Sequence, residues 1–228
     1  MNAMLRLQIK ELLMKYGACD VGFTSCEDAP NPSLPYAVSF VIHLSDAIID
    51  EIDNAPTHSY FHHYRTINTL IDQLELKVGF LLEQAGYQYL PVAASQSING
   101  YQGRYSHKKA ACLAGLGSIG KNNLFLHKIH GPRVRLGTVF TDCPFPIPQL
   151  APTLCTGCDA CVKACPSGAL TGQMWTPTST VSDLFDAEIC SMHMKKEYQL
   201  IGRGAVCGIC MRVCPASNFL KEQIHGKT

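Results

Sequence analysis

Eight of the twelve cysteines in this 228-residue chain lie between Cys155 and Cys214, and no other feature of the sequence constrains the fold as strongly. The first group reads Cys155-x2-Cys158-x2-Cys161-x3-Cys165 and is followed directly by a proline. Thiolates hold [4Fe–4S] clusters with this spacing in bacterial two-cluster proteins. The two-residue spacers let consecutive thiolates surround one corner of a cube. The longer step carries Cys165 away on a helical turn toward a second cluster.

A second group, Cys207-x2-Cys210-x3-Cys214, is also followed by a proline, and Cys190 upstream supplies a fourth thiol. In proteins with two such runs, the fourth cysteine of a run ligates the other cluster. The spacing therefore predicts a crossed assignment. It gives Cys155, Cys158, Cys161 and Cys214 to the first cluster, and Cys165, Cys190, Cys207 and Cys210 to the second. A pair of clusters so held predicts a relay for single electrons.

Zinc sites and disulfides are the alternative uses of clustered cysteines. Zinc sites rarely use paired runs of this spacing, and a reducing compartment disfavours disulfides. The other four cysteines have no partner spacing and are expected to be small packing residues: Cys19, Cys26, Cys112 and Cys143.

Charge balance and the N-terminal segment limit the remaining possibilities. Lys and Arg number 19 and Asp and Glu number 18, which argues against a dominant surface for polyanions. Residues 4–16 mix apolar and charged side chains with helical periodicity, unlike the uninterrupted apolar region of a signal peptide. No apolar stretch is long enough to span a bilayer. We therefore expect a cytoplasmic protein that does not enter the membrane.

Upstream of the cysteines the chain alternates helical and strand patterns. We expect helices over 4–16, 60–84 and 107–114, and strands over 20–24, 36–44, 87–94 and 133–142. Such alternation predicts an α/β (α+β) domain over residues 1–149. Several prolines mark its end, and a small ferredoxin-like module with two [4Fe–4S] clusters is expected over residues 150–228.

A glycine-rich loop precedes the cysteines. Gly115, Gly117 and Gly120 satisfy the pattern G-x-G-x-x-G. A dinucleotide-binding turn follows a strand and has an acidic residue about 20 positions later, whereas here a helical segment precedes the loop and no such acid follows. Two interpretations remain, a plain turn or a loop whose bare backbone packs against a large flat cofactor. In the second case, a side chain at Gly117 weakens cofactor binding more than folding.

Five segments occur in a recognisable order: AACLAGLGSIGKNNLFLH, RVRLGTVFTD, CTGCDACVKACPSGAL, FDAEICS and CGICMRVCPASN. Together they resemble the epoxyqueuosine reductase family, to which the reductive dehalogenases are more distantly related. The resemblance implies a nitroreductase-like, corrinoid-binding domain followed by the two-cluster module. Cobalamin would bind between them without a histidine ligand. The loop residues that would lie against the corrin are Gly115, Gly117, Gly120, Lys121 and Asn122.

Two departures from the family pattern concern the substrate. Members that act on tRNA carry a catalytic aspartate shortly before the glycine loop, and Tyr101 stands at the matching position here. The chain also ends at Thr228, without the helical-repeat tail with which those members hold tRNA. We therefore do not expect tRNA to be the substrate. Tyr101 is a candidate proton donor; the alternative is a loop tyrosine that packs on the corrin or is exposed.

Three functions are consistent with these patterns. The leading one is a cobalamin-dependent reductase that passes electrons from two [4Fe–4S] clusters to a corrinoid and on to a small-molecule substrate. The alternative is a non-catalytic electron carrier that docks on a partner protein and reduces the partner's corrinoid. The third is an epoxyqueuosine reductase that acts on tRNA.

Overall fold

The computed structural model describes residues 2–98 and 100–217. Its contacts divide the chain into two compact units, each made of three segments. The first unit comprises residues 1–43, 66–116 and 135–151, and the second comprises residues 44–65, 117–134 and 152–228. The predicted boundary after residue 149 lies close to the last of these junctions. The second unit, however, also takes in two segments from upstream.

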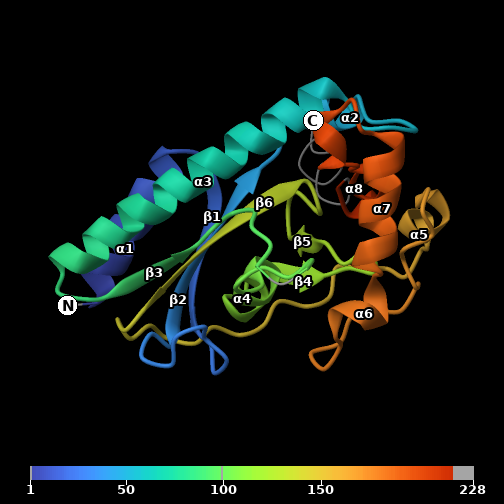
Figure 1. Cartoon of the computed structure of the whole chain (residues 1–228). Helices are drawn as coiled ribbons and strands as arrows, with labels where there is room; N and C mark the ends of the chain where they lie inside the picture. The colour runs from blue at the N-terminus through green and yellow to red at the C-terminus, as the bar shows by residue number, and fades with distance from the viewer. Residues whose placement is uncertain (1, 99, 218–228) are drawn as a thin grey trace, which may run out of the picture. The chain divides into compact units, whose positions relative to one another are not determined.

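The first unit is built on a four-stranded sheet with the strand order β1-β2-β6-β3 (Figure 1). The strands are β1 (Ala18–Ser25), β2 (Tyr36–His43), β3 (Tyr89–Val92) and β6 (Val134–Thr141). β1 pairs antiparallel with β2, and β3 pairs antiparallel with β6. The four strands confirm the sequence prediction, since their β-branched and aromatic residues suit a buried pleated surface. The antiparallel pairs give the mixed helix and strand fold an α+β character.

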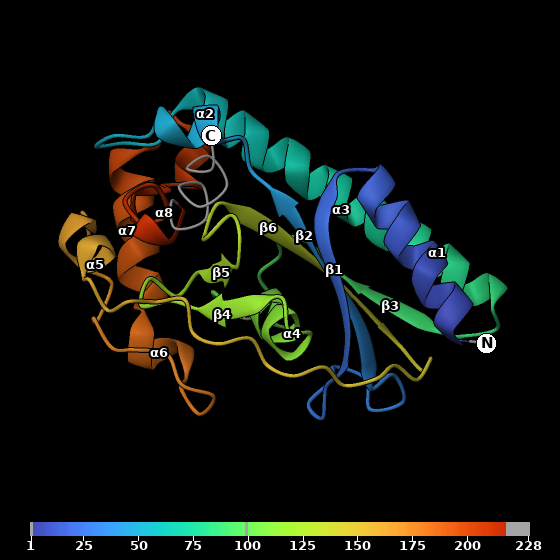
Figure 2. The same cartoon turned by 180° about the vertical axis from the view of Figure 1, so that it is seen from behind.

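Three helices accompany this sheet: α1 (Asn2–Lys15), α3 (His58–Gln84) and α4 (His107–Leu113). Figures 1 and 2 show α1 and α3 running over the same face of the sheet, and α4 packs against β1 and β2. α1 buries Leu5, Ile9 and Leu13, whose regular spacing, one position in every four, places them on one face of a helix. The three predicted helices are confirmed, and α3 buries a similar stripe of Ile71, Leu74, Val78 and Leu82.

The core of the first unit is tightly packed and contains one carboxyl group. A Cβ added to Gly137 would lie 2.2 Å from the ring of Phe40, so only glycine permits this approach of β6 to β2. Glu75 of α3 is 1% exposed, and it accepts a hydrogen bond from the backbone nitrogen of Thr138 at 2.8 Å. Burial raises the pKa of Glu75 to about 9 despite that bond. This carboxyl group is therefore neutral in the folded protein at pH 7.

The second unit contains a short hairpin and several short helices. The hairpin consists of β4 (Gly117–Ile119) and β5 (Phe125–His127), which pair antiparallel. The helices are α2 (Asp46–Asp50), α5 (Ala160–Ala164), α6 (Val181–Leu184), α7 (Ala187–Glu197), α8 (Ile209–Arg212) and the 3-10 turns Gly202–Gly204 and Pro215–Ser217. The sequence predicted a loop where the hairpin lies. The apolar residues of β4 and β5 are too few to show a strand period.

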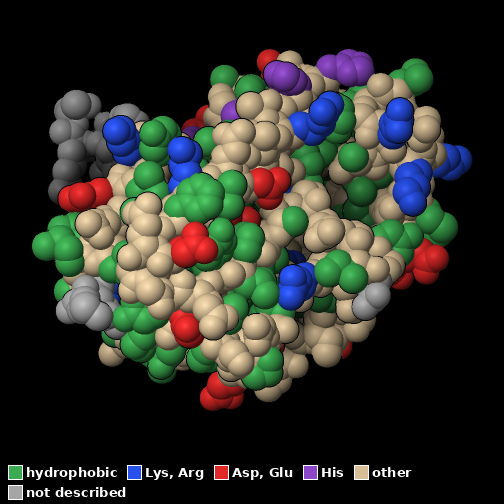
Figure 3. Space-filling view, turned by 60° about the vertical axis from the view of Figure 1, so that its left-hand side comes forward, with side chains coloured by type: hydrophobic (Ala, Val, Ile, Leu, Met, Phe, Trp, Pro, Cys, Tyr) green, Lys and Arg blue, Asp and Glu red, His purple; other side chains and the backbone are tan. Residues whose placement is uncertain are grey.

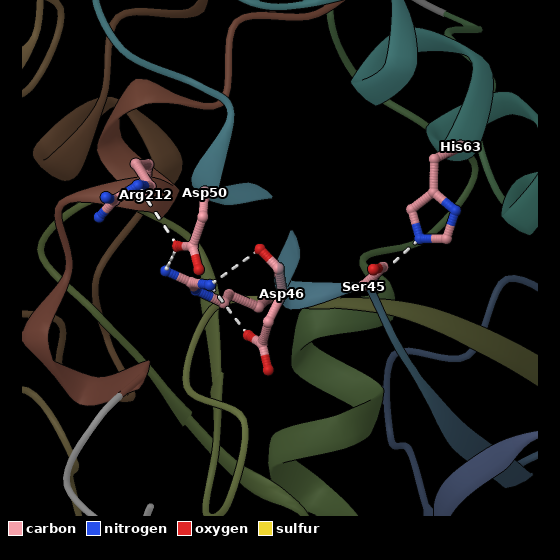
Figure 4. A network of polar contacts seen from close by, with 6 residues as sticks. Ser45, Asp46, Asp50, His63 and Arg212 are labelled. Atoms are coloured by element: carbon pink, nitrogen blue, oxygen red, sulfur yellow. Dashed lines mark hydrogen bonds and ion pairs between the residues drawn. The ribbon is translucent and has the colours of Figure 1, made fainter. Parts of the chain in front are cut away.

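An ion-pair network joins α2 to α8 within the second unit (Figure 4). The guanidinium group of Arg133 is 4% exposed and binds Asp46 at 2.9 Å and Asp50 at 2.8 Å. Asp50 also lies 3.4 Å from Nε of Arg212, a residue of α8. Farther along, the imidazole Nε2 of His63 accepts a hydrogen bond from the backbone nitrogen of Ser45 at 3.1 Å. These contacts explain why an upstream segment belongs to the unit that carries the clustered cysteines.

Charged side chains of both signs are interspersed on the face that Figure 3 shows, with hydrophobic side chains visible among them. This agrees with the near balance of 19 basic and 18 acidic residues in the sequence. Among the described residues, no helix is both long enough and apolar enough to cross a membrane.

Candidate iron–sulfur site

All eight clustered cysteines lie in the second unit, and none of the eight is joined in a disulfide. They are carried by α5, α7, α8 and the turns beside these helices. We call Cys155, Cys158, Cys161 and Cys214 the first set, and Cys165, Cys190, Cys207 and Cys210 the second set.

The four cysteines of the first set line one pocket. The pocket encloses about 350 Å³ of space, part of it open to solvent, and all four thiols of the set are among its lining residues. Cys214 reaches this pocket from the second run, which is far from the first group in the sequence. The structure thus brings together the residues that the crossed spacing predicted.

The cysteines of the second set are electrostatic neighbours of one another. Burial raises the pKa of the Cys190 thiol to about 11, with further contributions from Cys207 and Cys165. Burial also raises the pKa of Cys207, to which Cys165 contributes, and that of Cys210, to which the other three members contribute. Each predicted set is therefore a group of mutually close thiols. A weaker interaction between Cys210 and Cys161 links the two sets.

The two runs form similar local structures. α5 begins after Asp159, and α8 begins after Gly208; both preceding residues have left-handed backbones, with φ of 60° and 84°. Each of these residues follows directly on a cysteine, and the left-handed step turns the chain so that the next cysteine comes back on the first helical turn. α5 and α8 pack against each other. A proline after the last cysteine of each run prevents the helix from continuing.

The donor set fits iron–sulfur clusters chemically. Burial raises the pKa of Cys214 to about 11, with contributions from the other three thiols of the first set. Several thiolates crowded in one buried pocket repel one another, so they form only where a metal compensates their charge. Four thiolates around one cubane are the usual ligands of a [4Fe–4S] cluster. The eight cysteines are therefore suited to hold two clusters.

The turn between β4 and β5 contacts both cysteine sets. Lys121 lines the pocket of the first set, and its Nζ lies 2.5 Å from Oδ1 of Asp159 and 3.5 Å from the Gly157 carbonyl. Asn122 is buried, and its Nδ2 donates to the Cys210 carbonyl at 3.3 Å. The sequence predicted that Lys121 and Asn122 face a corrin. Their contacts within the second unit are with the cysteine loops.

The space beside the glycines of this loop is filled by the chain itself. A Cβ on Gly117 would lie 2.1 Å from the Leu126 carbonyl oxygen of β5, and one on Gly120 would lie 2.9 Å from Oδ1 of Asn122. In the first unit, a Cβ on Gly115 would lie 2.8 Å from the Gln149 carbonyl oxygen. Close packing of the backbone is thus a sufficient reason for glycine at the three positions. The predicted contact with a corrin remains a prediction.

Tyr101, the predicted proton donor, lies in a turn of the first unit and is 48% exposed. A neighbouring tyrosine has more defined surroundings, which the sequence did not indicate. Tyr105 donates from its hydroxyl to Oδ1 of Asp28 at 2.9 Å, and Nζ of Lys109 lies 2.5 Å from Oδ2 of the same carboxylate. Burial raises the pKa of Tyr105 far above its ordinary value, and Cys26 and Asp28 contribute. Asp28 lies far upstream of Tyr105, so no local spacing links the two residues.

Comparison with known proteins agrees with the cysteine site. A family model described as a 4Fe-4S double cluster binding domain matches residues 154–217. The curated relatives include an epoxyqueuosine reductase from Listeria monocytogenes, which is 34% identical over 67% of this chain and 38% of its own length. Another, from Vibrio cholerae, is 28% identical over 82% of this chain and 48% of its own length. The chain thus spans less than half of these two relatives.

Solved structures share the fold at low identity. A reductive dehalogenase described in connection with B12-dependent dehalogenation has a TM-score of 0.74 and 20% identity, covering 95% of this chain and 33% of the dehalogenase. An epoxyqueuosine reductase solved with an epoxyqueuosine-modified tRNA stem loop has a TM-score of 0.64 and 19% identity, covering 95% of this chain and 66% of that one.

The match over residues 154–217 shows a domain that binds two [4Fe–4S] clusters. Over the matched 67% of its length the chain is a homologue of an epoxyqueuosine reductase. It also shares the fold of solved reductive dehalogenases and epoxyqueuosine reductases, which confirms the resemblance noted in the sequence.

Proposed function

We propose that this protein is an iron–sulfur oxidoreductase in which the first and second sets of cysteines each hold one [4Fe–4S] cluster. The convergence of Cys155, Cys158, Cys161 and Cys214 on a single pocket carries this proposal. The mutual closeness of the second set supports it. Because the thiols of Cys161 and Cys210 are neighbours, clusters held by the two sets could exchange electrons.

The cluster proposal is tested by purifying the protein without oxygen and measuring its iron and acid-labile sulfide. We expect about eight of each per chain, the content of two cubanes. Visible absorption that bleaches on adding dithionite reports reducible clusters. A preparation that holds zinc and no sulfide overturns the proposal.

We further propose that the electrons pass to a cobalamin and from it to a substrate. The support is the likeness to the reductive dehalogenases, one of which is described as acting through B12. The glycine loop adds no support, because its bare positions are filled by Leu126, Asn122 and Gln149. We therefore derive no reaction step through a corrin from the contacts of this chain.

Titration with hydroxocobalamin tests this second step. The cluster-replete protein should bind the corrinoid stoichiometrically and change its visible spectrum. Absence of binding leaves the electron-carrier function, in which the clusters serve a separate partner protein.

Epoxyqueuosine reduction in tRNA is the second candidate, and the names of the curated relatives favour it. The sequence led us to expect no tRNA substrate, an expectation that these relatives do not support. The discriminating assay offers the reduced, cobalamin-loaded protein an anticodon stem-loop that contains epoxyqueuosine. Turnover to queuosine establishes this candidate. Binding of cobalamin without turnover favours a small-molecule substrate.

A further inference from the structure

One charged pair lines the pocket of the first cysteine set. Nζ of Lys121 lies 2.5 Å from Oδ1 of Asp159, and both residues line the pocket together with the four thiols of that set. Lys121 comes from the turn between β4 and β5, whereas Asp159 lies between two cysteines of the first run. The Gly157 carbonyl at 3.5 Å is a second acceptor for the ammonium. The cation is thus held at the pocket by groups from the cysteine loop itself.

We propose that Lys121, positioned by Asp159, raises the reduction potential of the cluster bound by the first set. The inference rests on the proposed function, since it requires that the cluster is present. The inference makes Lys121 a residue of the iron–sulfur centre that tunes the reduction potential of its cluster.

The sign of the effect follows from charge. A cluster gains one negative charge on reduction, so a nearby cation stabilises its reduced form more than its oxidised form. Net charge and hydrogen bonding around a cluster are known determinants of its potential. Lys121 therefore raises the potential, and the carboxylate of Asp159 lowers it.

The unequal burial of the two partners decides which effect is larger. The Lys121 side chain is 11% exposed and that of Asp159 is 45% exposed. Water and ions screen the more exposed carboxylate more than the less exposed ammonium, so the pair acts on the cluster as a net positive charge. Lys163 of α5 also lies near Asp159, but it is exposed and therefore more strongly screened.

The test measures the midpoint potentials of both clusters by anaerobic titration with dithionite, followed by electron paramagnetic resonance. Lys121→Met should lower one potential by about 59 mV, a tenfold change in a one-electron equilibrium. Asp159→Asn should raise the same potential by a smaller amount. Lys121→Arg should leave it close to the wild-type value because the charge is kept. Lys195→Met, which removes an exposed lysine of α7, is the matched control and should shift neither potential.

Iron and sulfide contents of each variant separate electrostatics from assembly. Unchanged potentials in the Met and Asn variants, with both clusters intact, overturn the proposal, as do shifts of the same sign in both. If the Met variant fails to hold its cluster, the Asn variant decides alone, and a fall or no change in its potential overturns the proposal. A wild-type protein without clusters overturns the proposed function itself, and this inference with it.

Discussion

Nδ2 of Asn122 donates a hydrogen bond to the backbone carbonyl of Cys210 at 3.3 Å, which joins the turn between β4 and β5 to helix α8. The preceding residue, Lys121, joins the same turn to the loop that carries the first cysteines. Lys121 therefore contacts a loop of the first cysteine set, and Asn122 contacts a loop of the second set. Within the second unit, the turn that the sequence presented as a candidate cofactor loop thus attaches to both parts of the candidate iron–sulfur site.

Removing the Asn122 side chain should weaken the attachment of helix α8 to this turn. Oδ1 of Asn122 also accepts from the Leu124 nitrogen at 3.1 Å, so Asn122→Ala removes a hydrogen-bond partner from two part-buried backbone groups. We expect a loss of about 1–3 kcal/mol in the free energy of unfolding and faster release of iron to a chelator. Urea unfolding under anaerobic conditions measures the first effect. Asn54→Ala is the control and should change stability by less than about 0.5 kcal/mol, since Asn54 is exposed. Equal stability of the two variants contradicts this structural role of Asn122.

The crossed ligand assignment is testable with paired serine variants. Cys165→Ser should remove the second cluster and reduce the iron content from about eight to about four. Adding Cys190→Ser should cause no further loss, because both cysteines belong to one set. Adding Cys155→Ser should instead remove nearly all the iron. An uncrossed assignment predicts the reverse outcome for the two double variants.

Arg133 should be important for holding α2 in the second unit. Arg133→Met removes one ion pair from Asp46 and one from Asp50, while Asp50 keeps its contact with Arg212. Breaking a buried pair costs roughly 3–5 kcal/mol. Because these two carboxylates are 30% and 51% exposed, water compensates part of the loss, and we expect about 2 kcal/mol. Lys196→Met removes a pair with Glu197 whose lysine is 83% exposed, and it should have almost no effect. The free energy of unfolding in urea tests the comparison, and similar losses in both variants contradict it.

Glu75 should make the stability of the protein depend on pH. Burial raises the pKa of Glu75 to about 9 in the folded protein, from an ordinary value of 4.5 in the unfolded chain. Between these pH values the folded state holds a proton that the unfolded state has lost. Stability therefore falls as pH rises, by up to about 1.4 kcal/mol per unit. Glu75→Gln cannot ionise, so its advantage over the wild type should be small near pH 5 and large near pH 8.5.

The measurement for Glu75 is the difference in unfolding free energy between variant and wild type at the two pH values. Subtracting the wild type removes the pH dependence of the other groups. Glu83→Gln, an exposed position on the same helix, is the control and should show no such trend. A pH-independent difference for Glu75→Gln contradicts the prediction.

Gly117→Ala should lower the stability of the folded protein. Its Cβ would lie 2.1 Å from the Leu126 carbonyl oxygen, so β4 and β5 must separate, at a cost of about 1–3 kcal/mol. The sequence suggested the opposite, that a side chain here acts mainly on a bound macrocycle. Thermal unfolding together with a cobalamin titration distinguishes the two. A variant of unchanged stability that loses only corrinoid binding supports the earlier interpretation.

Local patterns in the sequence indicated most of the helices and strands and the residues that we propose as metal ligands. The regular apolar spacing in α1 and the β-branched runs in β2 and β6 specify structure over short stretches of chain, so they could be recognised without coordinates. The cysteine runs could be recognised for the same reason, because one cubane constrains the spacing of the thiolates that surround it.

Tertiary structure decided which distant segments share the cluster unit and what faces the cysteines. Asp50 meets Arg212, and Lys121 meets Asp159, although the members of each pair are far apart in the sequence. Such contacts depend on how whole elements pack and leave no periodic signal in the sequence. Likewise, the glycines of the loop satisfy a cofactor motif, but only the position of Leu126 shows that the backbone of β5 occupies the space beside Gly117. The absence of a side chain at a glycine allows another group to pack closely there, and the fold determines which group that is.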